Sequence, residues 1–355
     1  MINTNSNFKV LIIRRDNIGD LLCTTPAIHA LRKAHPKCYI VVFANSYNAP
    51  IIDNNPDINR VEIYTKAKHR LKNESLLSVY INKLKKIFRL RKEQFDYVVV
   101  ASSGEKVHEW SIAKLIKPKS IIGYIDKNIK TKPNDIGLTF PSKKLHEVEY
   151  VFNLFRGIGV NLPIPPMQLL VNKTSNYPSI DVGITIGIHI SSRRIKQRWL
   201  IENYANLIKE INGEFKANFL IFWSPGSLDD PKHPGDDEKA LELLDLCVND
   251  PVKLYKTNTL QDLVIGLSLC QYVICPDGGG MHIAAALQKP IICLFGDSSS
   301  THWYPWGVKH KLLQPPSKNV KDISVLDVKN AFNDIYGKKI NCPNKNIYFI
   351  RAKKN

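Results

Sequence analysis

Short apolar strands alternate with longer helical segments along this chain, and that alternation limits the possible folds more than any other feature of the sequence. In the first half, runs rich in Val and Ile are predicted to be buried strands, and the segments between them carry apolar residues at helical spacing. The predicted strands are residues 8–13, 38–43, 95–101 and 120–124, and the predicted helices are residues 20–34, 75–92 and 107–116. Because β-branched strands joined by helices form parallel sheets covered on both faces, the first half is predicted to be a doubly wound α/β domain.

The same alternation starts again in the second half, after the proline-rich polar stretch that includes VNKTSNYPS. A linker is therefore predicted near residues 172–182, and a length of 355 residues suits two domains. The second set of predicted strands is 184–190, 217–223, 271–277 and 289–296, and the helices are about 201–211, 236–247, 259–269, 279–287 and 325–336. The predicted fold is α/β, with two Rossmann-like doubly wound domains, residues 1–175 and 182–355, that face a cleft. Ligands are expected outside the carboxyl ends of the strands.

The composition is that of a folded globular protein, with 44% hydrophobic and 23% charged residues, which excludes a disordered or fibrous chain. Lys and Arg number 50 against 32 Asp and Glu, so the net charge is +18. Only 12 of the basic residues are Arg and the lysines are scattered, so a general preference for Lys explains the charge better than a nucleic-acid surface. No nucleic-acid partner is predicted, whereas anionic substrates or an anionic membrane surface are favoured.

A cytoplasmic location is predicted, because the sequence has no run of 18 or more apolar residues and no recognisable secretory signal. The seven cysteines include no CxxC pair, which favours a reducing compartment and argues against a cysteine-ligated metal. Residues 66–92 hold ten Lys or Arg and one acid, with Leu77, Ile81, Leu84 and Phe88 at helical spacing. This segment is interpreted either as a crossover helix with a solvated lysine face or as a helix that contacts an anionic membrane.

The first candidate site follows the first predicted strand, where Gly19 permits a tight turn and Asp20 begins a helix. Asp20 places a carboxylate at the mouth of the predicted cleft. It is interpreted either as an N-cap that accepts a hydrogen bond from the first helical turn or as a functional acid or base. The loop lacks the GxGxxG pattern, which weakens a dehydrogenase interpretation.

The second candidate site is the segment CPDGGGMH, in which a strand ends at Asp277 and Gly278, Gly279 and Gly280 lead into a helix that carries His282. Unpaired backbone amides and the helix dipole make such a helix start a good anion site, and a diphosphate is the predicted ligand. His282 would add one donor, although a lone histidine is also common in a structural role. Asp277 either orients the loop or touches a ligand hydroxyl.

The third candidate site is HISSRRIKQRW, where Ser191 and Ser192 end a strand and four cations follow. Hydroxyls beside Lys196 and Arg198 suit phosphate oxygens, and a solvated basic loop is the alternative. The predicted position at the same sheet end as the glycine loop favours binding.

Together these motifs resemble those of the ADP-heptose:lipopolysaccharide heptosyltransferases, glycosyltransferase family 9. The resemblance covers most of the chain. Its first signature is Gly19-Asp20 followed by Thr25-Pro26, and its second is Asp277 to His282 followed by Ala285-Ala286-Leu287, Pro290, Leu294-Phe295-Gly296 and Trp303 to Gly307.

The resemblance implies a GT-B fold, an acceptor-binding first domain and a second domain that holds the nucleotide-sugar donor, ADP-heptose being expected. It implies inversion at the anomeric carbon without a metal and a lipopolysaccharide core acceptor. The basic segment 66–92, and not the resemblance, suggests peripheral contact with the inner face of the inner membrane. Asp20 matches the general base. Lys196 matches a phosphate-binding lysine, but the spacing to Trp199 is one residue longer than usual, so Arg198 is an equal candidate. Gly278 replaces a frequent Ser or Thr in the diphosphate loop.

Alternatives within this resemblance are another nucleotide sugar, a protein acceptor, or a nucleotide-sugar binding protein without turnover. The sequence has no counterpart of the cysteine-rich iron-binding segment of the protein-modifying members. No cofactor and no metal site are predicted. The acidic pairs Asp229-Asp230 and Asp236-Asp237 are interpreted as a solvated turn and helix caps in an exposed loop.

Overall fold

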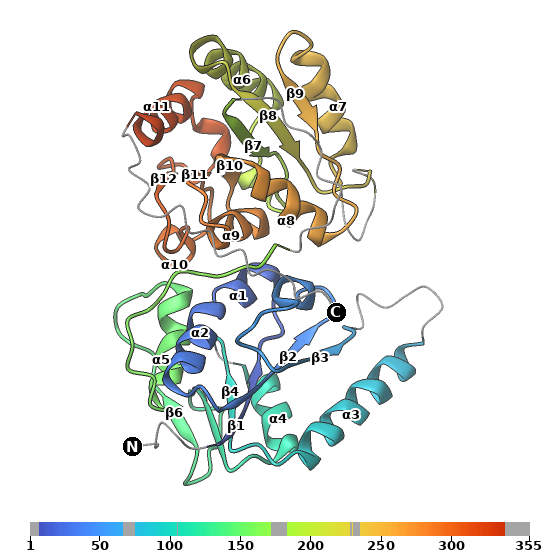
Figure 1. The fold of residues 1–355 in the computed structure, drawn as a ribbon, viewed down its shortest axis with the longest axis vertical. Helices are drawn as coiled ribbons and strands as arrows, with labels where there is room; N and C mark the ends of the chain where they lie inside the picture. Colours follow the sequence, from blue (N-terminus) through green and yellow to red (C-terminus); the bar gives the residue numbers. More distant parts are fainter. Residues whose placement is uncertain are drawn as a thin grey trace, which may run out of the picture.

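The protein consists of two parallel six-stranded sheets covered by helices (Figure 1). The computed structural model describes residues 7–66, 75–104, 106–171, 183–227, 229 and 235–337. The predicted linker at 172–182 lies outside these residues. The α/β prediction with two Rossmann-like domains is confirmed.

The first sheet is built from the Val- and Ile-rich runs and has the strand order β3-β2-β1-β4-β5-β6. Its strands are β1 (Lys9–Ile13), β2 (Tyr39–Asn45), β3 (Arg60–Tyr64), β4 (Tyr97–Val100), β5 (Ser120–Tyr124) and β6 (Ile136–Leu138). Side chains alternate across the sheet, so Val10 and Ile12 belong to the core under α2 (Thr25–Ala34) and α5 (Glu147–Arg156), whereas Leu11 and Ile13 pack on the other face. That other face is covered by α3 (Leu76–Lys92) and α4 (Val107–Ile116).

The second sheet has the order β12-β11-β10-β7-β8-β9. Its strands are β7 (Thr185–His189), β8 (Asn218–Phe222), β9 (Val252–Leu254), β10 (Tyr272–Pro276), β11 (Ile291–Leu294) and β12 (His310–Leu313). The longer helices are α6 (Ile201–Phe215), α7 (Asp237–Leu246), α8 (Leu260–Leu269), α9 (Gly279–Ala286) and α11 (Val325–Tyr336). Helices α6, α7 and α11 cover one face, and α8 and α9 cover the other.

Both sheets have the same topology when their strands are numbered in chain order, namely 3-2-1-4-5-6. In this arrangement the chain direction across the sheet reverses between β1 and β4 in the first domain and between β7 and β10 in the second. Ligands of doubly wound folds bind at such switch points, outside the carboxyl ends of the strands. The loops after β1, β7 and β10 are the ones that carry the three candidate sites.

The edge strands β3, β6, β9 and β12 and the helix α5 were not predicted from the sequence. The edge strands carry charged or exposed positions, and three of them have only three or four residues, so they lack a continuous apolar run. The single helix predicted over 20–34 is instead two helices, α1 (Ile18–Leu22) and α2. Thr24 lies between them and its backbone carbonyl accepts the first hydrogen bonds of α2.

The two domains are in contact through α1 and α9, and one apolar core runs from α2 and α5 of the first domain to α8 and α9 of the second. Side chains that follow α9 also donate hydrogen bonds to backbone carbonyls at residues 165 and 167. Trp306 donates to the carbonyl of Pro165 at 3.2 Å and Gln288 donates to that of Met167 at 3.2 Å. Within the described part of the chain, no helix has the length and apolar character needed to cross a membrane.

Candidate functional site

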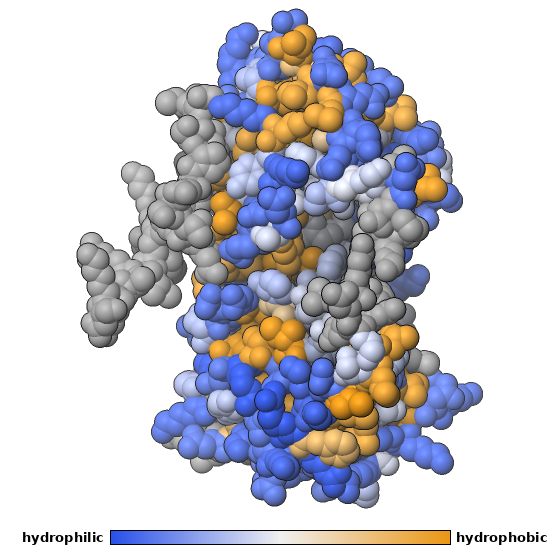
Figure 2. Space-filling model, turned by 90° about the vertical axis from the view of Figure 1, so that its right-hand side faces the viewer, coloured by the Kyte–Doolittle hydropathy of each residue, from blue (hydrophilic) through white to orange (hydrophobic). Residues whose placement is uncertain are grey.

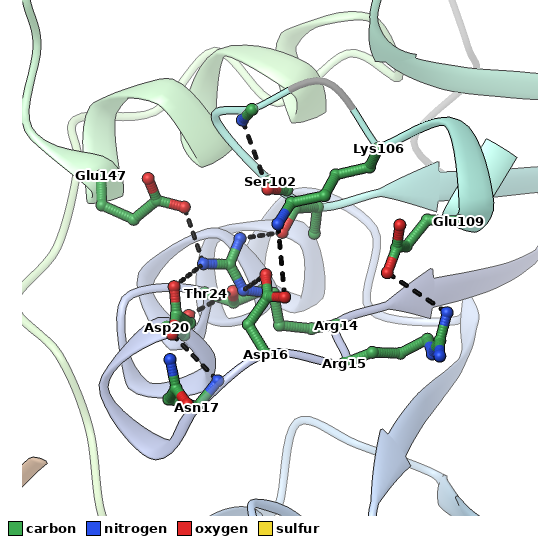
Figure 3. A network of polar contacts seen from close by, with 12 residues as sticks. Arg14, Arg15, Asp16, Asn17, Asp20, Thr24, Ser102, Lys106, Glu109 and Glu147 are labelled. Carbon is green, nitrogen blue, oxygen red and sulfur yellow. Dashed lines mark hydrogen bonds and ion pairs between the residues drawn. The ribbon is translucent and has the colours of Figure 1, made fainter. Parts of the chain in front are cut away.

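Arg14, the residue after β1, is the centre of a buried polar network at the switch point of the first domain (Figure 3). Its guanidinium donates to Oδ1 of Asp20 at 2.8 Å, to Oε1 of Glu147 at 2.7 Å and to the carbonyl oxygen of Ala101. The side chain is only 1% exposed. Burial alone would lower the pKa of Arg14, but the charges of Glu147, Asp20 and Asp16 outweigh burial and raise it. The arginine therefore stays charged and fixes the position of two carboxylates.

Asp20 is held at both carboxylate oxygens. Oδ1 accepts from Arg14, and Oδ2 accepts the backbone N–H of Asn17 at 2.9 Å. The N-cap of α1 is thus Asn17, and the interpretation of Asp20 as the N-cap is wrong because the helix begins two residues earlier, at Ile18. The Asp20 side chain remains 14% exposed. Because two carboxylate oxygens offer about four acceptor sites, two hydrogen bonds leave room for the proton of an incoming alcohol.

Glu147 is the first residue of α5 and connects this network to the second domain. Its Oε2 lies 3.1 Å from Nε2 of His302, which is in the short helix α10 (Ser300–Trp303). Burial alone would raise the pKa of Glu147, but the charge of Arg14 and hydrogen bonds from His302, Ser103 and Arg14 lower it to about 2. Burial lowers the pKa of His302, and its contacts with Glu147 and a backbone carbonyl reverse this and raise it. The pair is therefore a polar contact between the two domains.

His282 on α9 lies against α1 of the first domain. A Cβ atom placed on Gly19 would be 2.5 Å from Cδ2 of His282, and Nδ1 of the histidine is 3.9 Å from the sulfur of Cys23. Gly19 is inside α1 rather than in a turn, so its glycine serves this close approach and not the tight turn predicted for it. Burial lowers the pKa of His282, and the nearby carboxylates of Asp277 and Asp20 oppose this. The imidazole thus connects the second sequence signature to the first, and its contact with a phosphate stays a prediction.

Hydrogen bonds through the uncharged side chain of Gln197 organise the switch point of the second domain. Ser192 donates to Oε1 of Gln197 at 2.9 Å, and Nε2 of Gln197 donates to Oδ2 of Asp277 at 3.0 Å and to Ser298 at 3.0 Å. Ser191 is buried, and its hydroxyl accepts the backbone N–H of residue 224 at 2.9 Å. The loops after β7 and β10 are therefore joined through Gln197, which the sequence did not single out.

Lys196 and Arg198 are in different environments, although the sequence left them equal. Arg198 donates from Nε to the carbonyl of Ser192 at 2.8 Å, and its Nη1 is 3.6 Å from Oδ1 of the buried Asp236. Lys196 is exposed, and its ammonium has no ion pair with any residue that the structure describes. Of the two cations, Lys196 is the one available to a ligand.

The backbone at the start of α9 borders open space. Gly278 is the N-cap with an extended backbone, and a Cβ placed there would meet nothing within 4 Å. A Cβ on Gly279 would meet only Ile18 at 3.9 Å, whereas one on Gly280 would lie 3.1 Å from the His189 ring. The amides of a first helical turn have no partner within their own helix, so this opening suits an anion.

The acidic pairs do not form a metal site in the described residues, where no group of three or more His, Cys, Asp or Glu could hold an ion. Asp236 was predicted to be exposed, but it is 4% exposed and pairs with Arg198. Asp237 accepts the indole N–H of Trp223 at 2.6 Å. Asp229 is exposed, and Asp230 lies outside the described residues.

Sequence reasoning missed Arg14, Glu147 and Gln197. Arg14 had a detectable signal, since a cation directly after a buried strand needs an anionic partner. Glu147 had a weaker one, a carboxylate at the start of an apolar helical segment. Gln197 had none, because its role depends on the approach of residues about 80 and 101 positions away.

Two Rossmann-like domains with facing switch points are the arrangement of the GT-B fold. Residues 83–329 match the profile of glycosyltransferase family 9 (heptosyltransferase). The chain is 23% identical to lipopolysaccharide heptosyltransferase 3 of Escherichia coli, over 90% of this chain and 91% of that protein. The chain therefore belongs to glycosyltransferase family 9.

Two solved structures share the fold. A family 9 glycosyltransferase from Veillonella parvula has a TM-score of 0.74 at 17% identity, with 94% of this chain and 99% of that chain covered. An Escherichia coli heptosyltransferase with ADP-2-deoxy-2-fluoro heptose has a TM-score of 0.70 at 18% identity, with 92% and 99% covered. The resemblance found in the sequence is confirmed.

Proposed function

We propose that this enzyme transfers a heptose from ADP-heptose to a sugar of the lipopolysaccharide inner core, with inversion at the anomeric carbon. The observation that carries the proposal is the partly exposed Asp20 carboxylate, held by the buried Arg14 and close to the glycine-rich start of α9. The names of the relatives support the donor and acceptor, since one is a lipopolysaccharide heptosyltransferase and another was solved with an ADP-heptose analogue.

In the proposed reaction, Asp20 is the general base. Its carboxylate takes the proton from an acceptor hydroxyl while that oxygen attacks the anomeric carbon of the donor. The bond between this carbon and the diphosphate oxygen breaks, and ADP leaves with the electron pair. Arg14 holds the carboxylate in one orientation, and such positioned proton transfer is worth about 10²- to 10⁴-fold. A single displacement of this kind inverts the configuration.

The second domain would stabilise the departing diphosphate. Lys196 supplies a free cation, and the first-turn amides of α9 next to Gly278 and Gly279 supply donors in the open space. Asp277, fixed by Gln197, holds the loop in place. These groups provide the positive potential that a divalent ion gives in other glycosyltransferases, so turnover is proposed to be independent of metal. We place the enzyme at the cytoplasmic face of the inner membrane, where a lipid-linked acceptor would be reached.

The deciding experiment is Asp20→Asn. The expected result is a loss of turnover of about 10²-fold or more, because the amide cannot take the proton. ADP affinity, measured by calorimetry, should be unchanged, since the diphosphate binds in the other domain. A variant that keeps more than about a tenth of the wild-type rate contradicts the base assignment.

Asp16→Asn is the matched control, because Asp16 is a second carboxylate beside Arg14, with Oδ2 3.8 Å from Nε. It should retain most of the activity. Turnover after EDTA treatment, run in the same assay, tests the metal-independent mechanism. A comparison of ADP-, UDP- and GDP-linked sugars by thermal shift identifies the donor.

A further inference from the structure

Helix α3 presents an apolar stripe to solvent on the side opposite the protein core. Its buried positions are Val79, Ile87 and Leu90, which pack toward the sheet. The apolar side chains at the spacing noted in the sequence point the other way. They are Leu77 at 69% exposed, Ile81 at 42%, Leu84 at 46% and Phe88 at 49%, with Tyr80 at 55% beside them. The stripe is therefore not the core-facing side that a crossover helix normally requires.

The stripe is long and continuous. Steps of four, three and four residues keep Leu77, Ile81, Leu84 and Phe88 on one face, and eleven residues of helix span about 16 Å at 1.5 Å per residue. Figure 1 shows α3 along the outer edge of the first domain, and Figure 2, which views the molecule from that side, shows hydrophobic side chains among hydrophilic ones on this domain. Contiguous exposed apolar surface of this kind marks an interaction site.

The charges on α3 itself are all positive, since the helix contains no Asp or Glu. Its cations are Lys83, Lys85, Lys86, Arg89, Arg91 and Lys92. Four of them line a pocket of about 390 Å³ between α3 and β3: Lys83, Lys85, Lys86 and Arg89. Glu62 neutralises this group only in part, through Lys86 at 3.3 Å and Arg89 at 2.6 Å.

We propose that α3 docks on an anionic lipid surface, with the Leu77 to Phe88 stripe inserted among the acyl chains and the lysine-lined flank on the headgroup phosphates. The combination of an apolar stripe with flanking cations is the one that interfacial helices use, and anionic lipid adds attraction for each cation. A second copy of the chain fits less well, because a symmetric contact would bring two copies of the same cation-rich helix together. The proposal concerns lipid binding alone and does not depend on the transfer reaction.

The test is flotation of the full chain with phosphatidylcholine vesicles, with and without phosphatidylglycerol, in the absence of donor and acceptor. The wild-type protein should bind the anionic vesicles and release them at high salt. Leu77→Ser combined with Leu84→Ser should weaken binding by about tenfold or more, because two inserted side chains are lost. Lys85→Gln combined with Lys92→Gln should weaken it by about fivefold for each charge.

The matched control is Leu241→Ser with Leu326→Ser, which removes two equally exposed leucines, 56% and 61%, from the second domain. This variant should bind vesicles like the wild type. The proposal is overturned if the wild type does not bind anionic vesicles, or if the Leu77 and Leu84 variant binds as well as the wild type. It is also overturned if that variant turns a dimer into a monomer with vesicle binding unchanged, since the stripe would then contact a second copy. None of these outcomes affects the transferase proposal, which the Asp20→Asn assay tests separately.

Discussion

The switch points of the two domains have the same strand order but opposite chemistry. In the first domain, the loop after β1 satisfies its charges internally, because Arg14 binds both Asp20 and Glu147. In the second domain, the loops after β7 and β10 are joined by hydrogen bonds of the uncharged Gln197 side chain, and Lys196 has no ion pair with any described residue. A charge that is fixed by its partners suits a proton transfer that needs one geometry, whereas a free cation suits an anionic ligand. Under the proposed function, one topology would serve two tasks through its loop residues alone.

The largest effect is expected from Glu147→Gln, which breaks the internal charge balance of the first domain. Arg14 would keep only the partly exposed Asp20 and Asp16 as anionic partners, and removal of one partner from a buried ion pair typically costs about 3 kcal/mol or more. Urea unfolding at neutral pH measures the loss. Glu210→Gln is the control, because its contact with Lys329 is exposed and should contribute less than about 1 kcal/mol.

The buried contact between Arg14 and Glu147 also predicts how stability depends on pH. The pKa of Glu147 is lowered in the folded state from 4.5 to about 2, so its contribution is complete above pH 4.5 and is lost as the pH falls toward 2. The wild type should therefore lose more stability over this interval than Glu147→Gln. If the free energies of unfolding of the two proteins fall equally with decreasing pH, Glu147 is not ionised in its contact with Arg14.

In the second domain, substitutions of Lys196 and Arg198 should have different effects on ADP binding and on stability. Lys196→Ala should weaken ADP binding by about ten- to a hundredfold, the value of a lost charged hydrogen bond, and leave the free energy of unfolding unchanged. Arg198→Ala should do the reverse, since it leaves Asp236 without its cation and lowers stability by about 1–2 kcal/mol. Calorimetry with ADP and urea unfolding of both variants separate the two effects. A larger loss of ADP affinity in Arg198→Ala would exchange the roles.

The sequence predicted the central strands well because each is a continuous apolar run. Such runs are typical of parallel strands that are buried on both faces. It did not predict the edge strand β3, since RVEIY is interrupted by charge and its pairing depends on β2. It also singled out Asp20 and the glycine loop as candidates, because both lie where a strand end leads into a helix start; their roles stay predictions.

The partners of those residues could not be predicted. Arg14 meets Glu147 from 133 residues away, and Gln197 meets Asp277 from 80 residues away. Neither contact leaves a local pattern, because each depends on two loops that the parallel strands bring to one sheet edge. The sequence also could not tell whether the apolar stripe of α3 faces the core or the solvent. Apolar residues at helical spacing indicate that a helix has an apolar face, but not what covers that face.

The glycines next to the two switch points extend the comparison. Gly19 is packed against His282 of the other domain, so the glycine is needed for the contact between folded domains. Gly279 borders open space and has only Ile18 within 4 Å of a Cβ position. Gly19 should therefore affect the stability of the protein without ligand, and Gly279 should affect the affinity for ADP.

The smallest of these effects is expected for Gly279→Val, which should weaken ADP binding by about tenfold because its methyl groups occupy the space where phosphate oxygens approach the α9 amides. Its stability should change by less than about 1 kcal/mol, since the substitution is at a helix start and is not crowded. Gly19→Ala should instead lower stability by about 1–3 kcal/mol, because its Cβ would overlap His282 and the two domains must move apart. Calorimetry gives the ADP affinity of both variants, and urea unfolding gives their free energies of unfolding. If Gly279→Val binds ADP as tightly as the wild type while remaining folded, the start of α9 is not part of the donor site, and the division of tasks between the two switch points is wrong.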